Sequence, residues 1–270
     1  MLKTRVITGC ILGALLLLGL FLLPDAWAVL AFGGVFTLGA WEWAGFGALR
    51  SALGRICYTL IVALAFAASW RWTEDPAHLL LLMEAACAWW LIAFLWLWLA
   101  PARHQRLLVL ACGLPVLVPP FVALARLQVS ARGFAHGPVV VLCLVLIVCA
   151  ADIGAYFAGR RFGRRKLAPR VSPGKTWEGV IGGLLMVALL AWGGAAFFKL
   201  PAVGAIAFAC CVGIFSVIGD LTESMFKRAA ALKDSGALLP GHGGLLDRID
   251  SVTAAAPLYA LGLFGSGVIP

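Results

Sequence analysis

Charged residues are scarce in this chain. Only 12% of its 270 residues are Asp, Glu, Lys or Arg, whereas 63% are hydrophobic. A soluble domain or a disordered segment carries far more charge, so the composition excludes both classes. The apolar runs recur from end to end without strict alternation of apolar and polar residues, which excludes a membrane β-barrel and predicts a helical membrane protein.

Three further features are missing. None of the eight cysteines forms a Cys-x-x-Cys pair, so neither a disulfide framework nor a zinc site is indicated, and we expect small apolar packing residues. No internal repeat is evident, which weighs against the paired-repeat architecture of many transporters. The basic residues sit in short loops between apolar runs, so nucleic-acid binding is not indicated.

The apolar runs predict an all-α, polytopic bundle of about nine transmembrane helices. Several runs abut closely, which leaves a count of eight open. The first run, ending near Ala26-Trp27-Ala28, resembles a signal peptide, but it is long for one, and we expect an uncleaved span. The expected spans are residues 6–23, 26–49, 56–72, 78–99, 107–125, 138–158, 179–198, 202–221 and 251–269.

Basic residues divide unevenly between the two ends of these spans. If the N-terminus lies in the cytoplasm, 17 of the 21 Lys and Arg residues fall on the cytoplasmic side and four on the other. Positive residues favour the cytoplasmic side of a membrane. We therefore expect a cytoplasmic N-terminus, with the long loops at 159–178 and 222–250 on the cytoplasmic face.

The chain divides into two regions by the kind of residue it carries. Residues 1–150 are apolar spans with short loops, which we expect to form a scaffold and to provide any dimer contacts. Residues 151–270 hold the two long loops and nearly all of the chemically informative side chains. Glu42 and Glu84 fall within spans, and the sequence leaves open whether each makes a polar contact inside the bundle or lies nearer the interface.

The segment from Ser224 to Asp250 joins the last two spans and is the most informative part of the chain. Ionisable groups beside a bilayer are costly unless they pair, bind a metal or meet a charged ligand. If the helix continues past residue 219, then Asp220, Ser224 and Lys227 lie on one face. A helix end whose cations reach toward lipid head groups would explain Lys227 but not Asp220.

A Pro-Gly-His-Gly-Gly turn lies at residues 240–244. Glycines let backbone N–H groups converge into a site for phosphate oxygens, and a helix beginning near Leu245 would add its own amides. Asp247 and Asp250 would then lie three residues apart on that helix, on either side of Arg248. The alternative is a plain connection whose acids stabilise the helix dipole.

The other long loop ends in Gly174-Lys175-Thr176, which is similar to the end of a nucleotide-binding P-loop. That motif requires a glycine where Pro169 stands, and we expect no strand before it, so we reject a P-loop. We expect instead a cluster of Ser, Lys, Thr and Glu residues that opens a helix and suits phosphate oxygens. The arginines between 160 and 166 are explained by topology alone.

Four carboxylates are expected to converge on one interface from three span ends. They are Asp152, Asp220, Asp247 and Asp250. Carboxylates held close together repel unless a cation lies between them, and hard oxygen ligands favour Mg²⁺. The residues thus predict a metal-dependent enzyme that acts on a phosphorylated substrate at the membrane.

The chain resembles the phosphatidate cytidylyltransferases, or CDP-diacylglycerol synthases. Their signature is S-x-φ-K-R-x4-K-D-x-small-x2-φ-P-x-H-G-G-φ-x-D-R-φ-D, where φ is apolar, and residues 224–250 match every defined position. Upstream segments also match, namely 152–156, 159–160, 172–179 and 219–221. The resemblance covers roughly residues 150–255, and the first 150 residues fit only by their pattern of spans.

The resemblance implies that CTP and phosphatidate give CDP-diacylglycerol and pyrophosphate at the cytoplasmic face of a bacterial-type inner membrane. It implies Mg²⁺, allows a second, monovalent cation, and suggests a homodimer. By that resemblance Asp220 and Asp247 are metal ligands, Asp152 and Asp250 are further candidates, and Asp220, Lys227 and Asp247 are catalytic. The implied substrate-binding residues are Ser172, Lys175, Thr176, Glu178, Ser224, Arg228, Lys233, Asp234, His242, Gly243, Gly244, Arg248 and Asp250.

Two other interpretations can be compared with this one. A transporter could use Glu42, Glu84 and Asp152, but it predicts a site at the membrane midplane, whereas the polar residues crowd one interface. An enzyme that transfers an alcohol to a CDP-lipid would resemble D-G-x2-A-R-x8-G-x3-D-x3-D, and the chain has no such run.

Overall fold

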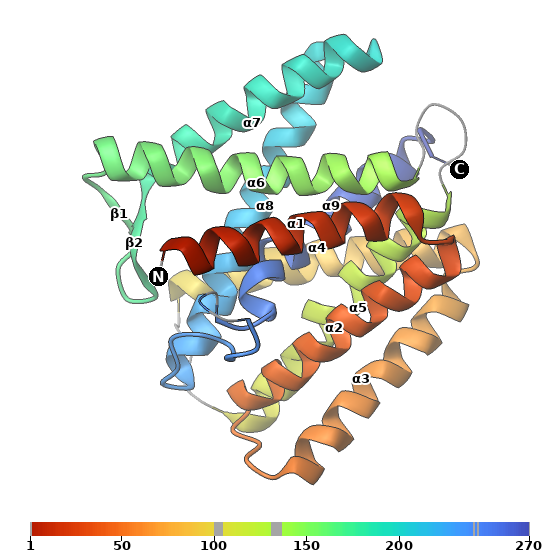
Figure 1. The fold of residues 1–270 in the computed structure, drawn as a ribbon, viewed down its shortest axis with the longest axis vertical. Helices are drawn as coiled ribbons and strands as arrows, with labels where there is room; N and C mark the ends of the chain where they lie inside the picture. Colours follow the sequence, from red (N-terminus) through yellow and green to blue (C-terminus); the bar gives the residue numbers. More distant parts are fainter. Residues whose placement is uncertain (1, 100–104, 131–136, 240, 242, 270) are drawn as a thin grey trace.

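The described part of the protein is a bundle of nine helices with one small β-hairpin (Figure 1). The structure is a computed structural model that describes residues 2–99, 105–130, 137–239, 241 and 243–269. The expected all-α polytopic architecture is confirmed. The helices are α1 (Leu2–Leu22), α2 (Asp25–Phe46), α3 (Ala52–Trp72), α4 (Pro76–Leu99), α5 (Arg106–Ser130), α6 (Gly137–Phe162), α7 (Trp177–Phe198), α8 (Ala202–Ala229) and α9 (Leu246–Gly265).

Seven of these helices, α2 to α8, are long and apolar enough to cross a membrane, and residues 7–22 of α1 form a shorter apolar helix. Several helices extend beyond the apolar runs from which they were predicted. Helix α3 begins at Ala52 rather than at residue 56 because the Ser51 hydroxyl accepts a hydrogen bond from the N–H of Gly54, which caps the helix. Helix α8 continues to Ala229 and α9 begins at Leu246, so both carry polar residues past the expected span ends.

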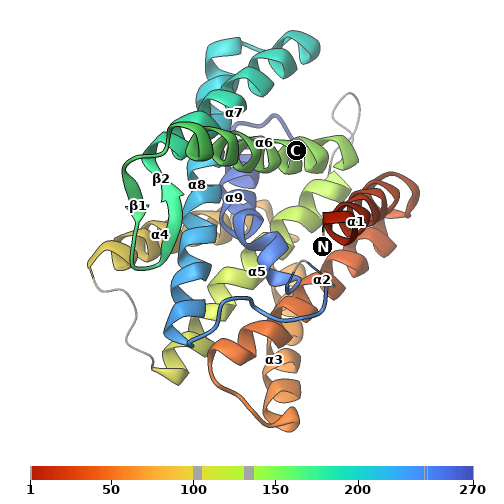
Figure 2. The same cartoon turned by 60° about the vertical axis from the view of Figure 1, so that its left-hand side comes forward.

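The two chain ends lie at opposite ends of the bundle in Figure 1. The connections after α2, α6 and α8 lie at the same end as the N-terminus, so the two long loops of the sequence are brought together there. Figure 2 shows α7 and α3 at opposite edges of the bundle, with α5, α8 and α9 between them. This arrangement places the chemically informative loops around the polar ends of α8 and α9.

Helix α5 is the most enclosed of the seven spanning helices, with 67% of its apolar window buried. It packs against α2, α3, α6 and α9. Its three internal prolines are tolerated because neighbouring membrane helices can satisfy the freed backbone groups. Trp43 of α2 donates from its indole nitrogen to the carbonyl of Val109 at 2.8 Å and packs on Phe226 of α8, which holds α2 between α5 and α8.

The β-hairpin was not expected from the sequence. Strands β1 (Lys166–Ala168) and β2 (Ser172–Thr176) pair antiparallel, with Lys166 opposite Thr176. Our expectation that no strand precedes Gly174 is therefore wrong. The expected cluster of Ser, Lys, Thr and Glu residues does open a helix, because Thr176 caps α7 and Glu178 lies in its first turn, but Ser172 and Lys175 lie in the hairpin. Pro173 and Gly174 are poor strand formers, so local propensity concealed the hairpin, which is anchored instead by the buried side chains of Leu167 and Val171.

Candidate active site

The polar face predicted for α8 exists as a continuous helical surface. Asp220, Ser224 and Lys227 all lie on α8, and the Ser224 hydroxyl lies 3.4 Å from Oδ1 of Asp220. The helix continues past Gly219 as expected. A Cβ on Gly219 would lie only 2.5 Å from the backbone oxygen of Asp250, so this glycine allows α8 and α9 to approach closely.

Lys227 is buried between two carboxylates. Its Nζ atom donates to Oδ1 of Asp247 at 2.6 Å and lies 3.1 Å from Oε1 of Glu223. The side chains of Lys227 and Glu223 are only 9% and 4% exposed. Removing one partner of a buried ion pair strongly destabilises the protein, because a buried charge is left unpaired. These three residues therefore act as a unit. Lys227 thereby ties the end of α8 to the start of α9.

The other oxygen of Asp247 binds backbone amides. Oδ2 accepts hydrogen bonds from the N–H groups of Ser235 and Gly244, each at 2.9 Å. The glycine-rich turn was expected to direct its amides at phosphate, but the Gly244 amide binds the protein's own carboxylate. The predicted roles of Gly243 and Gly244 in substrate binding stay predictions. His242 lies outside the residues that the structure describes.

Lys175 connects the hairpin to α8. Its Nζ atom lies 2.5 Å from Oδ2 of Asp220, although the two residues are 45 positions apart. Asp152 of α6 lies within electrostatic range of Asp220, Lys175 and Arg248. Asp250 is within the same range of Asp220 and Lys227. Asp152, Asp220 and Asp250 therefore lie near one another as expected, and Asp247 is connected to them through Lys227.

A cleft opens beside Asp220, between α6, α7, α8 and the hairpin. Its volume is about 460 Å³. Its polar lining comes mainly from Asp152, Tyr156, Arg160, Lys175 and Asp220. The lining contains both acids and cations, so the cleft can accept a ligand that carries both phosphate groups and a metal ion.

The carboxylates suit Mg²⁺ in chemistry and number. No three His, Cys, Asp or Glu side chains converge tightly enough to hold a metal by themselves among the described residues. Mg²⁺ is usually held by one or two carboxylates together with substrate phosphates and water. Asp220 on α8 and Asp247 on α9 are the two acids that the sequence predicts as ligands in such a site.

Other predicted residues of the hairpin loop have partners within the protein. Thr176 is buried, and its hydroxyl accepts from the N–H of Gly179 to cap α7. The Glu178 carboxylate accepts from the amides of Arg164 and Arg165 at 3.1 Å, which fixes the start of the loop. Ser172 pairs with Ala168 in the hairpin. The structure thus gives Thr176 and Glu178 a role in loop geometry, and their contacts with substrate stay predictions.

The remaining predicted residues lie at the exposed rim. Arg228 is exposed and points to the hairpin, where Nε lies 3.4 Å from the carbonyl oxygen of Val171. Lys233, Asp234 and Arg248 are also exposed. Lys227 and Arg228 therefore differ as the helical geometry predicts, because one faces the buried acids and the other does not.

Two acids outside the predicted site, Glu223 and Glu42, belong to the same network. Glu223 could have been found from its spacing to Lys227, since residues four apart on a helix are neighbours. Glu42 is buried, and its carboxylate binds Ser235 and the first amides of α9, so the open question about Glu42 is answered by a polar contact inside the bundle. Glu84 is exposed on α4 and, in the part of the chain that the structure describes, lies outside this network.

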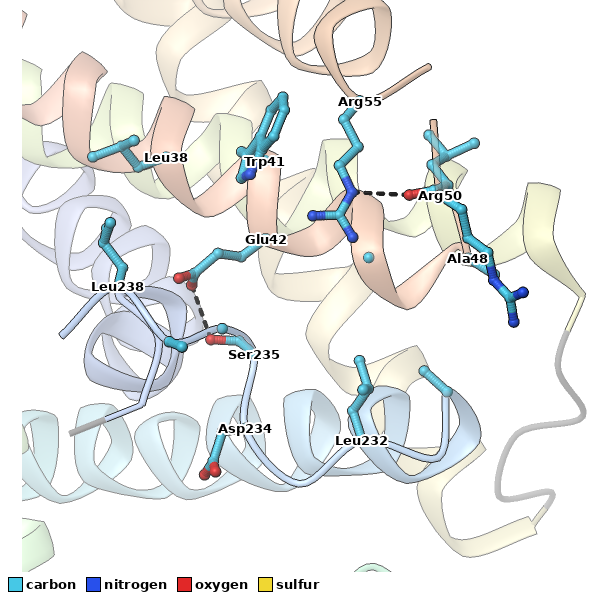
Figure 3. Close-up of a pocket in the computed structure, with 15 residues that line it drawn as sticks. Leu38, Trp41, Glu42, Ala48, Arg50, Arg55, Leu232, Asp234, Ser235 and Leu238 are labelled. Atoms are coloured by element: carbon cyan, nitrogen blue, oxygen red, sulfur yellow. Dashed lines mark hydrogen bonds between the residues drawn. The ribbon is translucent and has the colours of Figure 1, made fainter. Parts of the chain in front are cut away.

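A second cavity of about 930 Å³ lies on the other side of the Asp234–Ser235 segment. Figure 3 shows Trp41 and Glu42 of α2 on one wall, Arg55 of α3 nearby, and the segment after α8 on the other wall. Arg55 donates from Nε to the backbone oxygen of Leu49, so its guanidinium is held at the end of the cavity.

Comparison with known proteins gives a consistent result. A family model described as the cytidylyltransferase family matches residues 3–264. A protein of Pseudomonas aeruginosa named phosphatidate cytidylyltransferase is 43% identical over 99% of this chain and 98% of its own length. A protein of Haemophilus influenzae with the same name is 41% identical over 96% of this chain and 98% of its own. A Brucella melitensis protein of that name is 49% identical over 47% of this chain and 46% of its own. The family model and the two relatives that match over nearly their full lengths show that this chain belongs to the cytidylyltransferase family.

Proposed function

We propose that this protein is a phosphatidate cytidylyltransferase, which transfers CMP from CTP to phosphatidate and releases pyrophosphate. The observation that carries the proposal is the convergence of Asp220, Asp247, Lys175 and Lys227 at one end of a membrane bundle. Two relatives that match over nearly their full lengths carry this activity in their names. The product is CDP-diacylglycerol, a precursor in phospholipid biosynthesis.

The reaction needs positioning and charge neutralisation more than a strong base. A phosphate monoester is largely ionised at neutral pH, so the phosphatidate oxygen is already a nucleophile. This oxygen forms a bond to the α-phosphorus of CTP, and the bond from that phosphorus to the pyrophosphate oxygen breaks with its electron pair. Lys175 and Lys227 would stabilise the charge that develops on the transferred and departing groups.

Asp220 and Asp247 are the residues that would hold Mg²⁺ together with the CTP phosphates. The ion would supply Lewis acidity and charge neutralisation when bound. Asp152 and Asp250 lie within electrostatic range of Asp220, and a second, monovalent cation would be accommodated by the same cluster. The cleft beside Asp220 is open to a substrate that enters along α6 and the hairpin.

We also propose that this end of the bundle faces the cytoplasm of a bacterial-type inner membrane, where CTP is available. The connections after α2, α6 and α8 lie there, and the basic residues concentrate in the same loops. A homodimer is proposed on the family resemblance alone. The mass of the detergent-solubilised protein, corrected for bound detergent, tests it.

The activity is tested by incorporation of labelled CTP into chloroform-soluble lipid by the purified protein. Incorporation should require both phosphatidate and Mg²⁺. Diacylglycerol, which lacks the phosphate nucleophile, is the matched control and should support none. Incorporation that proceeds equally with diacylglycerol, or none with phosphatidate in a correctly folded preparation, would contradict the proposal.

A further inference from the structure

Among the described residues, the hydrogen bonds of Glu42 on α2 all go to the segment that carries Asp247. Oε1 accepts from the N–H of Leu245 at 3.1 Å, and Oε2 accepts from the N–H of Leu246 at 2.8 Å. Oε2 also accepts from the hydroxyl of Ser235 at 2.9 Å (Figure 3). The carboxylate is only 6% exposed, and the donors lie about two hundred residues away in the chain.

These contacts supply a cap that α9 lacks in its own sequence. The N-cap position is Leu245, whose side chain cannot accept a hydrogen bond. The first amides of a helix have no partner within the helix and also attract negative charge. Glu42 satisfies two of them from another helix, and so it sets where α9 begins and how its first turn is oriented.

Two glycines of the signature segment make room for this carboxylate. A Cβ at Gly236 or at Gly244 would collide with the Glu42 oxygens. Neither glycine has a positive φ in the structure, so neither is required here by backbone conformation. The close approach of Glu42 is therefore a sufficient reason for glycine at positions 236 and 244.

Ser235 carries the connection from Glu42 to the reacting groups. Its hydroxyl donates to Glu42 and lies 3.3 Å from the N–H of Asp247, and its own N–H donates to Oδ2 of Asp247 at 2.9 Å. Oδ1 of Asp247 binds Lys227. A continuous hydrogen-bonded chain therefore runs from Glu42 through Ser235 and Asp247 to Lys227.

We infer that Glu42 is a positioning residue for the nucleotidyl transfer, acting through Ser235 and the first turn of α9 to hold Asp247 in place. Only the kinetic effects expected from this inference depend on the proposed function. Glu42 sits on a rigid support, since the adjacent Trp43 is fixed by Val109 and Phe226. A carboxylate held in this way fixes its partners more precisely than a loop residue can.

At position 42, both side-chain oxygens have to accept hydrogen bonds. In Glu42→Gln the amide NH₂ would face the backbone N–H of Leu245 or that of Leu246, and two donors cannot share a hydrogen bond. Glu42→Asp keeps both acceptors but shortens the reach by one methylene. We therefore expect the Asp variant to retain more activity than the Gln variant.

The first experiment measures steady-state kinetics of Glu42→Gln with CTP and phosphatidate varied separately. We expect kcat to fall about 10- to 100-fold, while KM for each substrate changes by less than about threefold. Glu84→Gln is the matched control, because Glu84 is the other acid expected within a span and is exposed. It should leave both constants unchanged. A Glu42→Gln enzyme with wild-type kcat would overturn the inference.

The second experiment is a double-mutant cycle with Ser235→Ala, which removes only a hydroxyl. If Glu42 acts through Ser235, the double variant should lose little more kcat than the worse single variant. Effects that multiply would show that Glu42 does not act through Ser235. Because Ser235→Ala and Glu42→Asp are milder than Glu42→Gln, they decide the question if the Gln variant does not fold.

The third experiment does not depend on activity. Hydrogen exchange in the peptide covering residues 243–248 should be faster in Glu42→Gln than in wild type, and unchanged in Glu84→Gln. Wild-type exchange in Glu42→Gln would contradict the positioning role even if the protein proved to catalyse another reaction. Failure of the cytidylyltransferase assay in wild type would instead contradict the proposed function.

Discussion

Lys227 and Asp247 form an ion pair of 2.6 Å between the end of α8 and the first turn of α9. Glu223, one turn before Lys227, lies 3.1 Å from the same ammonium group. The lysine is thereby held between two acids. Arg228, the next residue, is exposed and contacts the hairpin instead.

This difference predicts separate effects for the two cations of the signature. Lys227→Gln should lower kcat by about 30- to 1,000-fold, or roughly 2–4 kcal/mol, because a contact to transition-state charge is lost. Arg228→Gln should act mainly on KM or on stability. Steady-state kinetics of both variants, with each substrate varied, measure this. Small and equal effects would refute the assignment.

Asp220 and Asp247 are predicted to share Mg²⁺ with the CTP phosphates. Asp220→Asn and Asp247→Asn should leave the protein inserted but reduce kcat by at least about 100-fold, since a neutral amide is a poor Mg²⁺ ligand. Asp247→Asn should also lower stability, because it removes one partner of the buried Lys227. Asp25→Asn, at an exposed position in the first turn of α2, is the control and should be fully active. If either site variant keeps wild-type activity at low Mg²⁺, the aspartate that it replaces is not a metal ligand.

Lys175, whose ammonium group lies beside Asp220, is predicted to bind a phosphate group of the substrate. Lys175→Gln should reduce kcat/KM for CTP by about 10- to 100-fold, the cost of one charged contact to phosphate. Lys166, which is exposed on the paired strand β1, provides the control Lys166→Gln. Similar losses in the two variants would mean that general positive charge in the hairpin, rather than the Lys175 contact, supports activity.

The proposed orientation is tested by thiol labelling in a cysteine-free background. Ser235 would be a poor probe because it is only 8% exposed, whereas Ala237 and Leu200 are both exposed and lie in different connections. In intact cells, Ala237→Cys should resist an impermeant thiol reagent and Leu200→Cys should react. Labelling of Ala237→Cys from outside would overturn the proposed cytoplasmic face.

The helices and one face of the site could be predicted from the sequence because both depend on local spacing. An apolar run of about 20 residues must satisfy its backbone groups internally, and so it is a helix wherever it meets lipid. The arrangement of Asp220, Ser224 and Lys227 follows in the same way from the helical repeat once α8 is known to continue. The start of α9 near Leu245 was also correct to within one residue.

The hairpin and the partners of the acids were decided by tertiary contacts. Strand β2 contains Pro173 and Gly174, so its local preference opposes the structure that pairing and the burial of Val171 impose. Lys175 meets Asp220 only because the hairpin folds back on α8.

Glu42 is the clearest case of a role that only the fold could assign. The sequence shows an acid in an apolar span, and such a residue is costly unless it finds donors. It does not show which donors, because the amides of Leu245 and Leu246 are identical in chemistry to every other amide in the chain. Packing α2 against the start of α9 selects them, and the lack of Cβ atoms at Gly236 and Gly244 leaves the space in which the carboxylate fits.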